Sequence, residues 1–368
     1  MLRTIAVENY RSLRHVVVGL EPLNVVTGAN GSGKTSVYRA LRLLADVVSS
    51  GAISTLAQEG GMRSALHAGP RRSEHVAMRL GFASDDLSYA IDLGLPTMGP
   101  FTLDPVIKTE SVWAGEVLRP ATLLADRRGA LVRTRDADGA WTSAPWRLGD
   151  HESLMSALVD PAQAPEVYAI REQARRWRFY DHLRTDADAP ARRPGVATFT
   201  PVLSPTGGDL AAALTTIDRI GDSGYLRSVV QDAFDGSELV LTEDDDGTCR
   251  VALRQPGISR PLGAAELSDG TLRLLLLAAA LLSPRPPGLL VLNEPEASLH
   301  PSLLPALAAM VAEAARRTQV VVVTHARVLV QALRPEANVI ELVRTGAVTT
   351  VSGQLELEGP TWAWPRRS

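Results

Sequence analysis

The sequence predicts an α/β protein with a mixed-sheet lobe plus a helical insertion, and three patterns carry this prediction. Two runs of almost only apolar residues, 289–292 and 320–324, alternate with helical patterns, as buried parallel strands do in sheets covered on both faces. A glycine-rich turn near residue 30 separates an apolar strand from a helix. Segments between 76 and 93 alternate apolar and polar residues with a period of two, which indicates an antiparallel layer.

The composition is that of a folded chain and excludes several classes of protein. The 368 residues carry a formal net charge of −3 and are 45% apolar, which excludes disorder and a wholesale polycation. The single cysteine, Cys249, excludes an intramolecular disulfide framework and a zinc site of clustered thiolates. No run approaches the roughly 20 apolar residues of a membrane helix, and none resembles a signal peptide. We therefore expect a cytoplasmic protein with no membrane partner.

The order of elements is expected to change along the chain. The N-terminal part has expected strands at 4–7, 15–18, 23–26, 76–82, 87–93 and 131–135, and an expected helix at 35–47. The middle part is expected to be helical at 151–184, 209–220 and 225–234, with a loop at 186–205. The last part has an expected hairpin at 239–242 and 248–253, strands at 289–292 and 320–324, and helices at 268–282, 302–317 and 327–333.

The most specific motif is the run Gly28, Ala29, Asn30, Gly31, Ser32, Gly33, Lys34 and Thr35, which Ser36 follows. It fits G-x-x-x-x-G-K-[ST] and lies between an expected strand and an expected helix, the context that this phosphate-binding motif requires. The glycines let backbone N–H groups surround phosphates, and the helix N-terminus adds partial positive charge. Lys34, one of only two lysines in the chain, suits the terminal phosphates, and Thr35 offers a hydroxyl to Mg²⁺. A glycine-rich turn that arose by chance is the alternative.

Polar residues follow both apolar strands. Asn293, Glu294, Pro295 and Glu296 follow the first strand, and His325 follows the second. The carboxyl ends of strands are where open α/β sheets bind their ligands. Glu294 is placed to orient or deprotonate an attacking water, and His325 can donate a hydrogen bond to a γ-phosphate. The alternatives are a turn in which Glu296 begins a helix, and a histidine that is merely satisfied in the core or exposed.

Ser268 and Gly270 begin the long apolar helix. A helix start of this kind can bind an anion, because its first N–H groups have no partner within the helix. Serine and glycine are also favoured at ordinary helix N-caps, so an ordinary N-cap stays open as the alternative.

Taken in order, these motifs resemble those of ABC-type ATPase heads, which belong to the P-loop NTPases, and specifically the RecF/SMC/OLD-like branch with its small RecF-like AAA-family predicted ATPases. The run 5–13 resembles the first strand of that branch, 267–271 the ABC signature, 298–301 the D-loop, and 324–325 the switch histidine. The likeness covers roughly residues 1–50 and 260–335 and is weaker at 180–186. It implies one ATPase head over 1–368, with an N-terminal lobe at 1–150, a helical insertion at 151–235 and a C-terminal lobe at 236–368.

The resemblance also implies a mechanism. ATP and Mg²⁺ bind, and two heads associate as a homodimer in which Ser268 and Gly270 of one copy complete the site at 28–36 of the other. The resemblance assigns catalytic roles to Lys34, Glu294 and His325, and it places Thr35 and Asn293 at the metal. Such a dimer is expected to act on double-stranded DNA in repair or genome maintenance. The alternative is a slow nucleotide switch that regulates a separate effector protein, for example in phage defence.

Two features depart from the family pattern. Asn293 stands where the family usually has Asp, and an amide accepts a hydrogen bond from a metal-bound water but brings no charge. We therefore expect weaker Mg²⁺ binding, slower turnover, or both. The second departure concerns the glutamine of the family's Q-loop. Gln58 is a candidate for it, but it is interpreted equally well as a solvated loop residue.

A cluster of arginines suggests where DNA would bind. Arg171, Arg175 and Arg178 would share one face of the expected helix, with Arg176 beside them and aromatic residues at 177, 179 and 180. Arginines interleaved with aromatics can contact phosphates and stack on bases. The alternative is a solvated helix in which Glu172 pairs with Arg176.

Replacing Asn293 by Asp is predicted to lower the Mg²⁺ concentration that supports half-maximal ATP hydrolysis, because a carboxylate adds negative charge beside the metal. Mg²⁺ titrations of the ATPase rate, run in parallel on both proteins, measure this. An unchanged requirement would show that residue 293 does not act on the metal.

Overall fold

The computed structural model describes residues 1–69, 77–96, 101–136, 138–354 and 359–367, and the chain divides into two compact units. Unit one comprises Met1–Glu21, Val26–Trp177 and Ile340–Ser368, and unit two comprises Pro22–Val25 and Arg178–Val339. Two of the boundaries fall inside strands, in β3 (Leu23–Gly28) and in β17 (Asn338–Thr345). This division differs from the expected lobes at 1–150, 151–235 and 236–368. The C-terminal strand β18 (Val348–Val351) packs on β2 and so belongs with the N-terminal residues.

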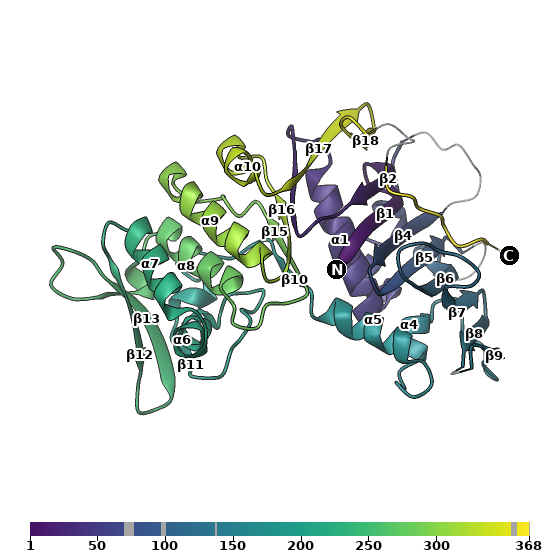
Figure 1. Ribbon diagram of the computed structural model, residues 1–368, viewed down its shortest axis with the longest axis horizontal. Helices are drawn as coiled ribbons and strands as arrows, with labels where there is room; N and C mark the ends of the chain where they lie inside the picture. The colour runs from purple at the N-terminus through teal and green to yellow at the C-terminus, as the bar shows by residue number, and fades with distance from the viewer. Residues whose placement is uncertain (70–76, 97–100, 137, 355–358, 368) are drawn as a thin grey trace. The chain divides into compact units, whose positions relative to one another are not determined.

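Unit one is built on an antiparallel sheet of eight strands in the order β2-β1-β4-β5-β6-β7-β8-β9 (Figure 1). Its strands are β1 (Leu2–Tyr10), β2 (Leu13–Gly19), β4 (Met78–Ser84), β5 (Leu87–Gly94), β6 (Val106–Ala114), β7 (Leu123–Arg128), β8 (Leu131–Arg135) and β9 (Trp141–Ser143). Its helices are α1 (Lys34–Ser50), α2 (Ala52–Gln58), α3 (Met62–Ala65), α4 (Leu154–Ala157) and α5 (Pro165–Arg175). Helix α1 packs against β1, β4 and α5, and α5 packs against β5, so these helices cover the sheet. The expected strands of this part are confirmed, except that Val76 lies outside the described residues.

The sequence patterns do not predict β6, β7 and β9, and buried charge is the reason for the first two. Glu110 of β6 and Arg127 of β7 are fully buried and form an ion pair at 3.3 Å. The hydroxyls of Tyr89 and Ser153 also donate to the Glu110 carboxylate, at 2.7 and 2.6 Å. A charge that is buried with its partners breaks the apolar–polar alternation by which strands are recognised in a sequence.

Unit two is built on strands in the order β10-β15-β16-β3, of which β3 contributes its first residues. Its strands β10 (Arg178–Tyr180), β15 (Leu289–Asn293) and β16 (Gln319–Val323) are parallel to one another. Its helices are α6 (Leu210–Ile220), α7 (Ser223–Ala233), α8 (Asp269–Leu281), α9 (Leu304–Ala315) and α10 (Arg327–Leu333). The hairpin of β12 (Glu238–Glu243) and β13 (Thr248–Arg254) pairs with the short strands β11 (Gly195–Val196) and β14 (Leu262–Gly263).

Helix α8 is the centre of the core of unit two. Its residues 274–281 are all buried, among side chains of α6, α9 and the parallel strands. Apolar residues around the whole helix are typical of a helix that is covered on all sides. Among the described residues, no helix is both long enough and apolar enough to cross a bilayer.

The helix expected over 151–184 is two short helices, α4 and α5, with non-helical residues between them, and its last part is wrong. Helix α5 ends at Arg175, and Arg178–Tyr180 forms β10 in register with Leu290–Leu292 of β15. Tyr180 is buried, and its hydroxyl donates to the carbonyl oxygen of Leu203 at 2.6 Å. Pairing with a strand that is distant in the sequence decides the conformation here, because strand propensity depends strongly on such context.

Candidate functional site

The glycine-rich run forms a loop between β3 and α1 in unit one. Lys34 is buried, and its Nζ donates to the carbonyl oxygens of Gly28 at 2.8 Å and Ala29 at 3.0 Å. The backbone N–H of Ser32 donates to the carbonyl oxygen of Ala29 at 3.1 Å and closes the turn. The loop thereby curls around its lysine, as the sequence motif predicts, while Ala29, Asn30, Gly31 and Thr35 are exposed.

Two glycines of this loop have positions that no other residue fits. Gly28 has a φ of 149°, and a Cβ there would lie 2.4 Å from the carbonyl oxygen of Leu342. Gly33 has a φ of 107°, and a Cβ there would lie 2.3 Å from Oγ1 of Thr349. Both φ values are in the region that favours glycine, so sterics and backbone conformation act together.

Strands β17 and β18 hold the loop from the other side. The hydroxyl of Thr349 donates to the carbonyl oxygen of Ser32 at 2.8 Å, and Arg344 donates to that of Gly31 at 3.3 Å. Thr349 is fully buried, so this contact fixes the loop backbone. Residues near the C-terminus therefore shape a loop near the N-terminus, within unit one.

The N-terminus of α1 has features of an anion-binding site. The helix begins at Lys34 with no side-chain cap and no acidic residue in its first turn. Its first N–H groups carry the positive end of the helix dipole. Ser32 Oγ is buried and has no hydrogen-bond partner in the described part of the chain. Glycines that exclude a Cβ, an uncapped helix start, Lys34 and the Thr35 hydroxyl together fit the phosphates of a nucleotide.

A second cluster of polar groups lies at the carboxyl edge of the parallel strands in unit two. Asn293 of β15 lies beside Val323 of β16, so the residues that follow these two strands meet. Glu294 Oε1 lies 3.6 Å from Nδ1 of His325, and both side chains are about half exposed, at 45% and 49%. Glu294 has a φ of 47°, in the left-handed region, and its N–H donates to the Val323 carbonyl oxygen at 2.8 Å. The strand ends thus bring together the two side chains expected to contact water and phosphate.

Glu296 holds the histidine turn in place and does not begin a helix. Its carboxylate is nearly buried, and Oε1 accepts hydrogen bonds from Oγ1 of Thr324 at 2.5 Å and from the backbone N–H of His325 at 3.2 Å. Nδ1 of His325 lies 3.4 Å from the same oxygen. Glu296 is therefore a positioning residue for His325, which the sequence motif alone does not reveal.

Asn293 is paired with a carboxylate. It is 8% exposed, and its Nδ2 donates to Oδ1 of Asp181 at 2.7 Å. Asp181 directly follows Tyr180, the partner of Leu292 in the parallel pairing of β10 with β15. Because the amide uses its N–H on Asp181, its carbonyl oxygen is left to accept a hydrogen bond. Sequence analysis gave Asp181 no role, although the stretch 180–186 in which it lies has a weak likeness to the family.

Arg273 of α8 is a further residue that sequence reasoning missed. It is 6% exposed, and it donates to the carbonyl oxygens of Leu183 at 2.7 Å and Glu294 at 3.4 Å. Burial lowers the pKa of its guanidinium, and the negative charges of Glu296 and Asp181 oppose that shift. The sequence signal that could have revealed Arg273 is its position as a lone cation within an apolar helix, because a buried charge needs partners.

Ser268 is the N-cap of α8, as the ordinary reading of this motif expects. Its Oγ accepts a hydrogen bond from the backbone N–H of Thr271 at 3.1 Å. A Cβ on Gly270 would lie 3.1 Å from the carbonyl oxygen of Ser298, so the signature-like and D-loop-like segments lie side by side in unit two. Arg192 supports this turn by donating to Asp269 at 2.7 Å.

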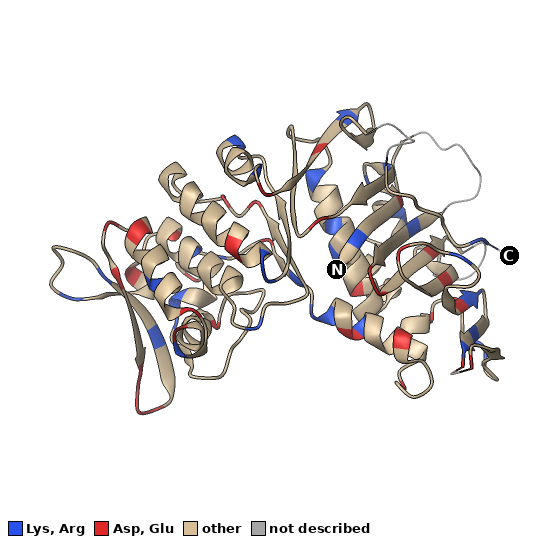
Figure 2. Cartoon of the chain, viewed as in Figure 1, with Lys and Arg blue, Asp and Glu red and all other residues tan. Residues whose placement is uncertain are grey.

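The arginine patch expected to contact DNA is wrong as a shared helical face. Arg171 is 8% exposed and donates to the carbonyl oxygen of Met155 at 3.2 Å, and Arg178 lies on β10 instead of on α5. Arg175 pairs with Glu172 at 3.0 Å, which replaces the expected pair of Glu172 with Arg176. Figure 2 shows acidic and basic residues interspersed along α5. Gln58 is exposed at the end of α2.

The residues present suit a metal that is bound together with a nucleotide. Among the described residues, no three His, Cys, Asp or Glu side chains are grouped to hold a metal ion on their own. Mg²⁺ usually keeps several waters and is bound through one or two protein groups plus phosphates. The Thr35 hydroxyl in unit one offers an oxygen of the chemistry that Mg²⁺ prefers. In unit two, the Asn293–Asp181 pair separately offers amide and carboxylate oxygens.

Comparisons with known proteins show which family and which fold the chain is similar to. A family model described as "AAA domain, putative AbiEii toxin, Type IV TA system" matches residues 23–330. The fold is similar to that of the Smc head from Pyrococcus furiosus bound to the C-terminal domain of ScpA, at 13% identity, with 95% of each chain covered and a TM-score of 0.53. It is also similar to the Smc head of Pyrococcus yayanosii, at 11% identity, with 97% of this chain and 98% of that chain covered and a TM-score of 0.52. No curated protein sequence matches the chain. These solved structures show that the chain has the fold of Smc head domains.

Replacing Gly33 by Ala should weaken nucleotide binding about tenfold or more, because the new Cβ meets Thr349 and the backbone φ becomes strained. Gly31→Ala is the matched control, because Gly31 has a φ of 74° but nothing within 4 Å of its Cβ position, so only the φ cost applies. A fluorescent ATP analogue measures both affinities. Equal losses for the two variants would show that the contact with Thr349 does not shape the loop.

Proposed function

We propose, from the premise that this chain belongs to the AAA-domain family, that it binds ATP with Mg²⁺ and hydrolyses it to ADP and phosphate. The observation that supports this most directly is the loop of unit one, where a buried lysine, positive-φ glycines and an uncapped helix start meet. The pair of Glu294 and His325 in unit two supports the hydrolytic step.

Each residue has a role that follows from its chemistry. Lys34 exchanges its bonds to backbone carbonyl oxygens for bonds to the terminal phosphates, and the N–H groups of the loop and of the first turn of α1 bind the remaining oxygens. Mg²⁺, when bound, neutralises charge on the phosphates. The Thr35 hydroxyl faces the metal. Glu294 orients the attacking water and accepts its proton, and His325 donates to the γ-phosphate.

Asp181 provides the negative charge that residue 293 lacks. Asn293 and Asp181 form one hydrogen-bonded unit that carries a single carboxylate. In the family pattern, which has Asp at the position of residue 293, that residue itself carries the negative charge. We propose that Asn293 accepts the hydrogen bond of a metal-bound water while Asp181 polarises the amide and supplies the charge.

We further propose that ATP joins two copies of the chain in a homodimer, in which Ser268 and Gly270 of one copy complete the site of the other. Coupling to DNA in genome maintenance is the first candidate role. The second candidate is a slow nucleotide switch acting on an effector protein, which the toxin–antitoxin context in the family description favours. DNA contact through the arginines of α5 is not part of the proposal.

Replacing Glu294 by Gln should lower the ATPase rate by about a hundredfold or more while leaving nucleotide affinity intact, because the amide cannot accept the proton of water. The rate is measured with and without double-stranded DNA. Stimulation of the wild type by DNA supports the first role, and a slow rate unmoved by DNA supports the second. Hydrolysis at the wild-type rate by the variant would contradict the assignment of Glu294.

Replacing Asp181 by Asn should raise the Mg²⁺ concentration needed for half-maximal binding of a fluorescent ATP analogue by about tenfold or more, since the local charge is lost. The double variant Asp181→Asn with Asn293→Asp returns the charge and reverses the hydrogen bond, so it should restore the wild-type requirement. The readout is binding, so it does not depend on turnover. A double variant that behaves like the single one would contradict this role of Asp181.

A further inference from the structure

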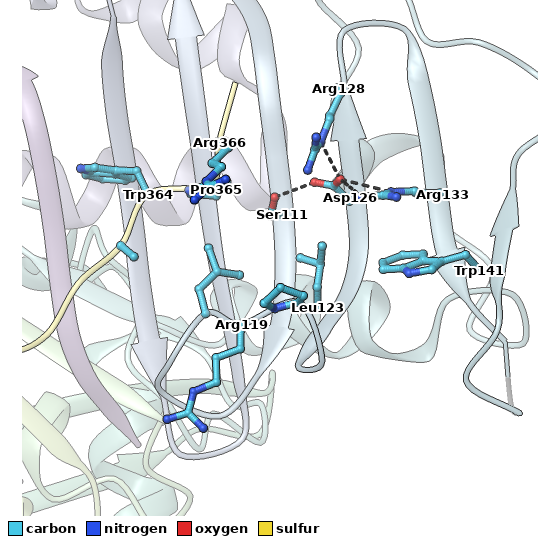
Figure 3. A pocket seen from close by; sticks show the side chains of 13 residues that line it. Ser111, Arg119, Leu123, Asp126, Arg128, Arg133, Trp141, Trp364, Pro365 and Arg366 are labelled. Atoms are coloured by element: carbon cyan, nitrogen blue, oxygen red, sulfur yellow. Dashed lines mark hydrogen bonds and ion pairs between the residues drawn. The ribbon is translucent and has the colours of Figure 1, made fainter. Parts of the chain in front are cut away.

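We propose that a pocket at the β7–β9 end of the sheet in unit one binds a nucleotide unit, meaning a planar base joined to a phosphate. The pocket has a volume of about 660 Å³, within the range of about 300–1,000 Å³ typical of small-molecule sites. Strands β6 to β9, the turn at 118–120 and the C-terminal segment 363–366 form its walls (Figure 3). It shares no residue with the loop at 28–36 or with the strand ends of unit two, so it is a second site, independent of the proposed ATPase activity.

The wall formed by β7 and β8 carries an excess of positive charge. Asp126 is nearly buried, and its Oδ2 accepts hydrogen bonds from Arg128 Nε at 2.9 Å and Arg133 Nη2 at 2.8 Å. Its Oδ1 accepts from the hydroxyl of Ser111 at 2.9 Å. One carboxylate thus holds two guanidiniums in place, and their side chains remain 39% and 40% exposed. Their remaining N–H groups can donate to an anion, because a guanidinium has five donors.

Two more arginines line the pocket. Arg119 and Arg366 are exposed, and within the described ranges neither forms an ion pair with a carboxylate. The lining therefore contains four arginines and one aspartate. Planar guanidinium forks match the oxygens of a phosphate, which lysine does less well.

Two indoles flank the pocket. Trp141 of β9 is 37% exposed, and the guanidinium carbons of Arg133 and Arg135 lie 4.5 and 4.7 Å from its ring centroid. Figure 3 shows Trp364 on the opposite side of the pocket, with Leu123 between the two indoles. Because the two guanidiniums lie over the ring, indole and arginines form one layer of planar groups, on which a nucleobase can stack while its phosphate is bound.

The C-terminal wall is held firmly enough to form a site. Arg367 donates to both oxygens of Asp92, at 2.5 and 2.6 Å. Trp362 packs edge-on against Trp113 of β6 and against Trp364, with ring centroids 5.7 and 5.2 Å apart. The indole nitrogen of Trp364 is buried and has no hydrogen-bond partner among the residues described.

The combination of groups selects the ligand. Arginines alone would bind any anion, and indoles alone would bind any apolar ring, whereas a base joined to a phosphate uses both. An acidic peptide would satisfy the arginines but offers no planar ring to Trp141. A free mononucleotide and single-stranded nucleic acid share the required chemistry, and the experiment distinguishes them.

The test uses the full chain with Lys34→Ala, so that the loop of unit one does not contribute to binding. Fluorescence anisotropy of a labelled twelve-residue oligothymidylate gives the affinity, and unlabelled thymidine monophosphate competes with it. Trp141→Ala should raise the Kd about five- to a hundredfold. Arg366→Ala should raise it too and reduce its dependence on salt. Trp146→Ala and Arg147→Ala are matched controls, because both side chains are exposed, Trp146 at 38%, and neither lines the pocket.

Both sources of the ligand can be told apart. Displacement by the monophosphate identifies a free mononucleotide as sufficient, and displacement only by unlabelled oligomer identifies a strand. Either result supports the site if Trp141→Ala and Arg366→Ala weaken binding and the controls do not. Absence of binding, or equal affinity of Trp141→Ala and Trp146→Ala, would overturn the proposal. ATP hydrolysis by a chain with Trp141→Ala alone should be unchanged, which separates this site from the proposed ATPase. Should Trp141→Ala fail to fold, the exposed Arg366 still provides the test.

Discussion

The parallel pairing of β10, β15 and β16 is the constraint on which the polar cluster of unit two depends. Tyr180, Leu292 and Val322 lie in one register, so the residues that follow them end at one edge. Asp181 then meets Asn293, and Glu294 meets the turn that carries His325. A shift of one residue in any of these strands would turn the side chains to the opposite face of the sheet and separate the cluster.

Burial determines how the charges of this cluster are balanced. Asn293 and Glu296 are nearly buried, whereas Glu294 and His325 are half exposed. Asn293 donates to Asp181, and Oε1 of Glu296 accepts from Thr324 and from the backbone N–H of His325, so these buried groups support the residues that carry the exposed pair. Arg273 supplies a positive charge from within α8 and ties the backbone at Leu183 to that at Glu294. The exposed side chains of Glu294 and His325 are therefore supported by side chains that are nearly buried.

In unit one, too, residues that are distant in the sequence hold the candidate binding groups in position. The glycine-rich loop at 28–36 is shaped by strands β17 and β18 near the C-terminus. Leu342 and Thr349 of these strands leave no room for a Cβ on Gly28 or Gly33. At the other end of the unit, the C-terminal tryptophans cover the sheet and complete a pocket rich in arginine. The C-terminal residues thus act twice, once on the loop and once on the pocket, because they fold back onto the N-terminal sheet.

The sequence by itself determined the loop at 28–36, the helix that follows it, the buried parallel strands and the residues at their ends, because these depend on local spacing and on runs of apolar residues. Only the tertiary structure decided that Asp181 is the partner of Asn293, that Glu296 holds the turn of His325, and that Arg178 belongs to a strand. Strands β6 and β7 were likewise hidden, since Glu110 and Arg127 look solvated in sequence and are buried as a pair. These features arise from contacts between residues far apart in the chain, and such contacts leave no periodic pattern in any one segment.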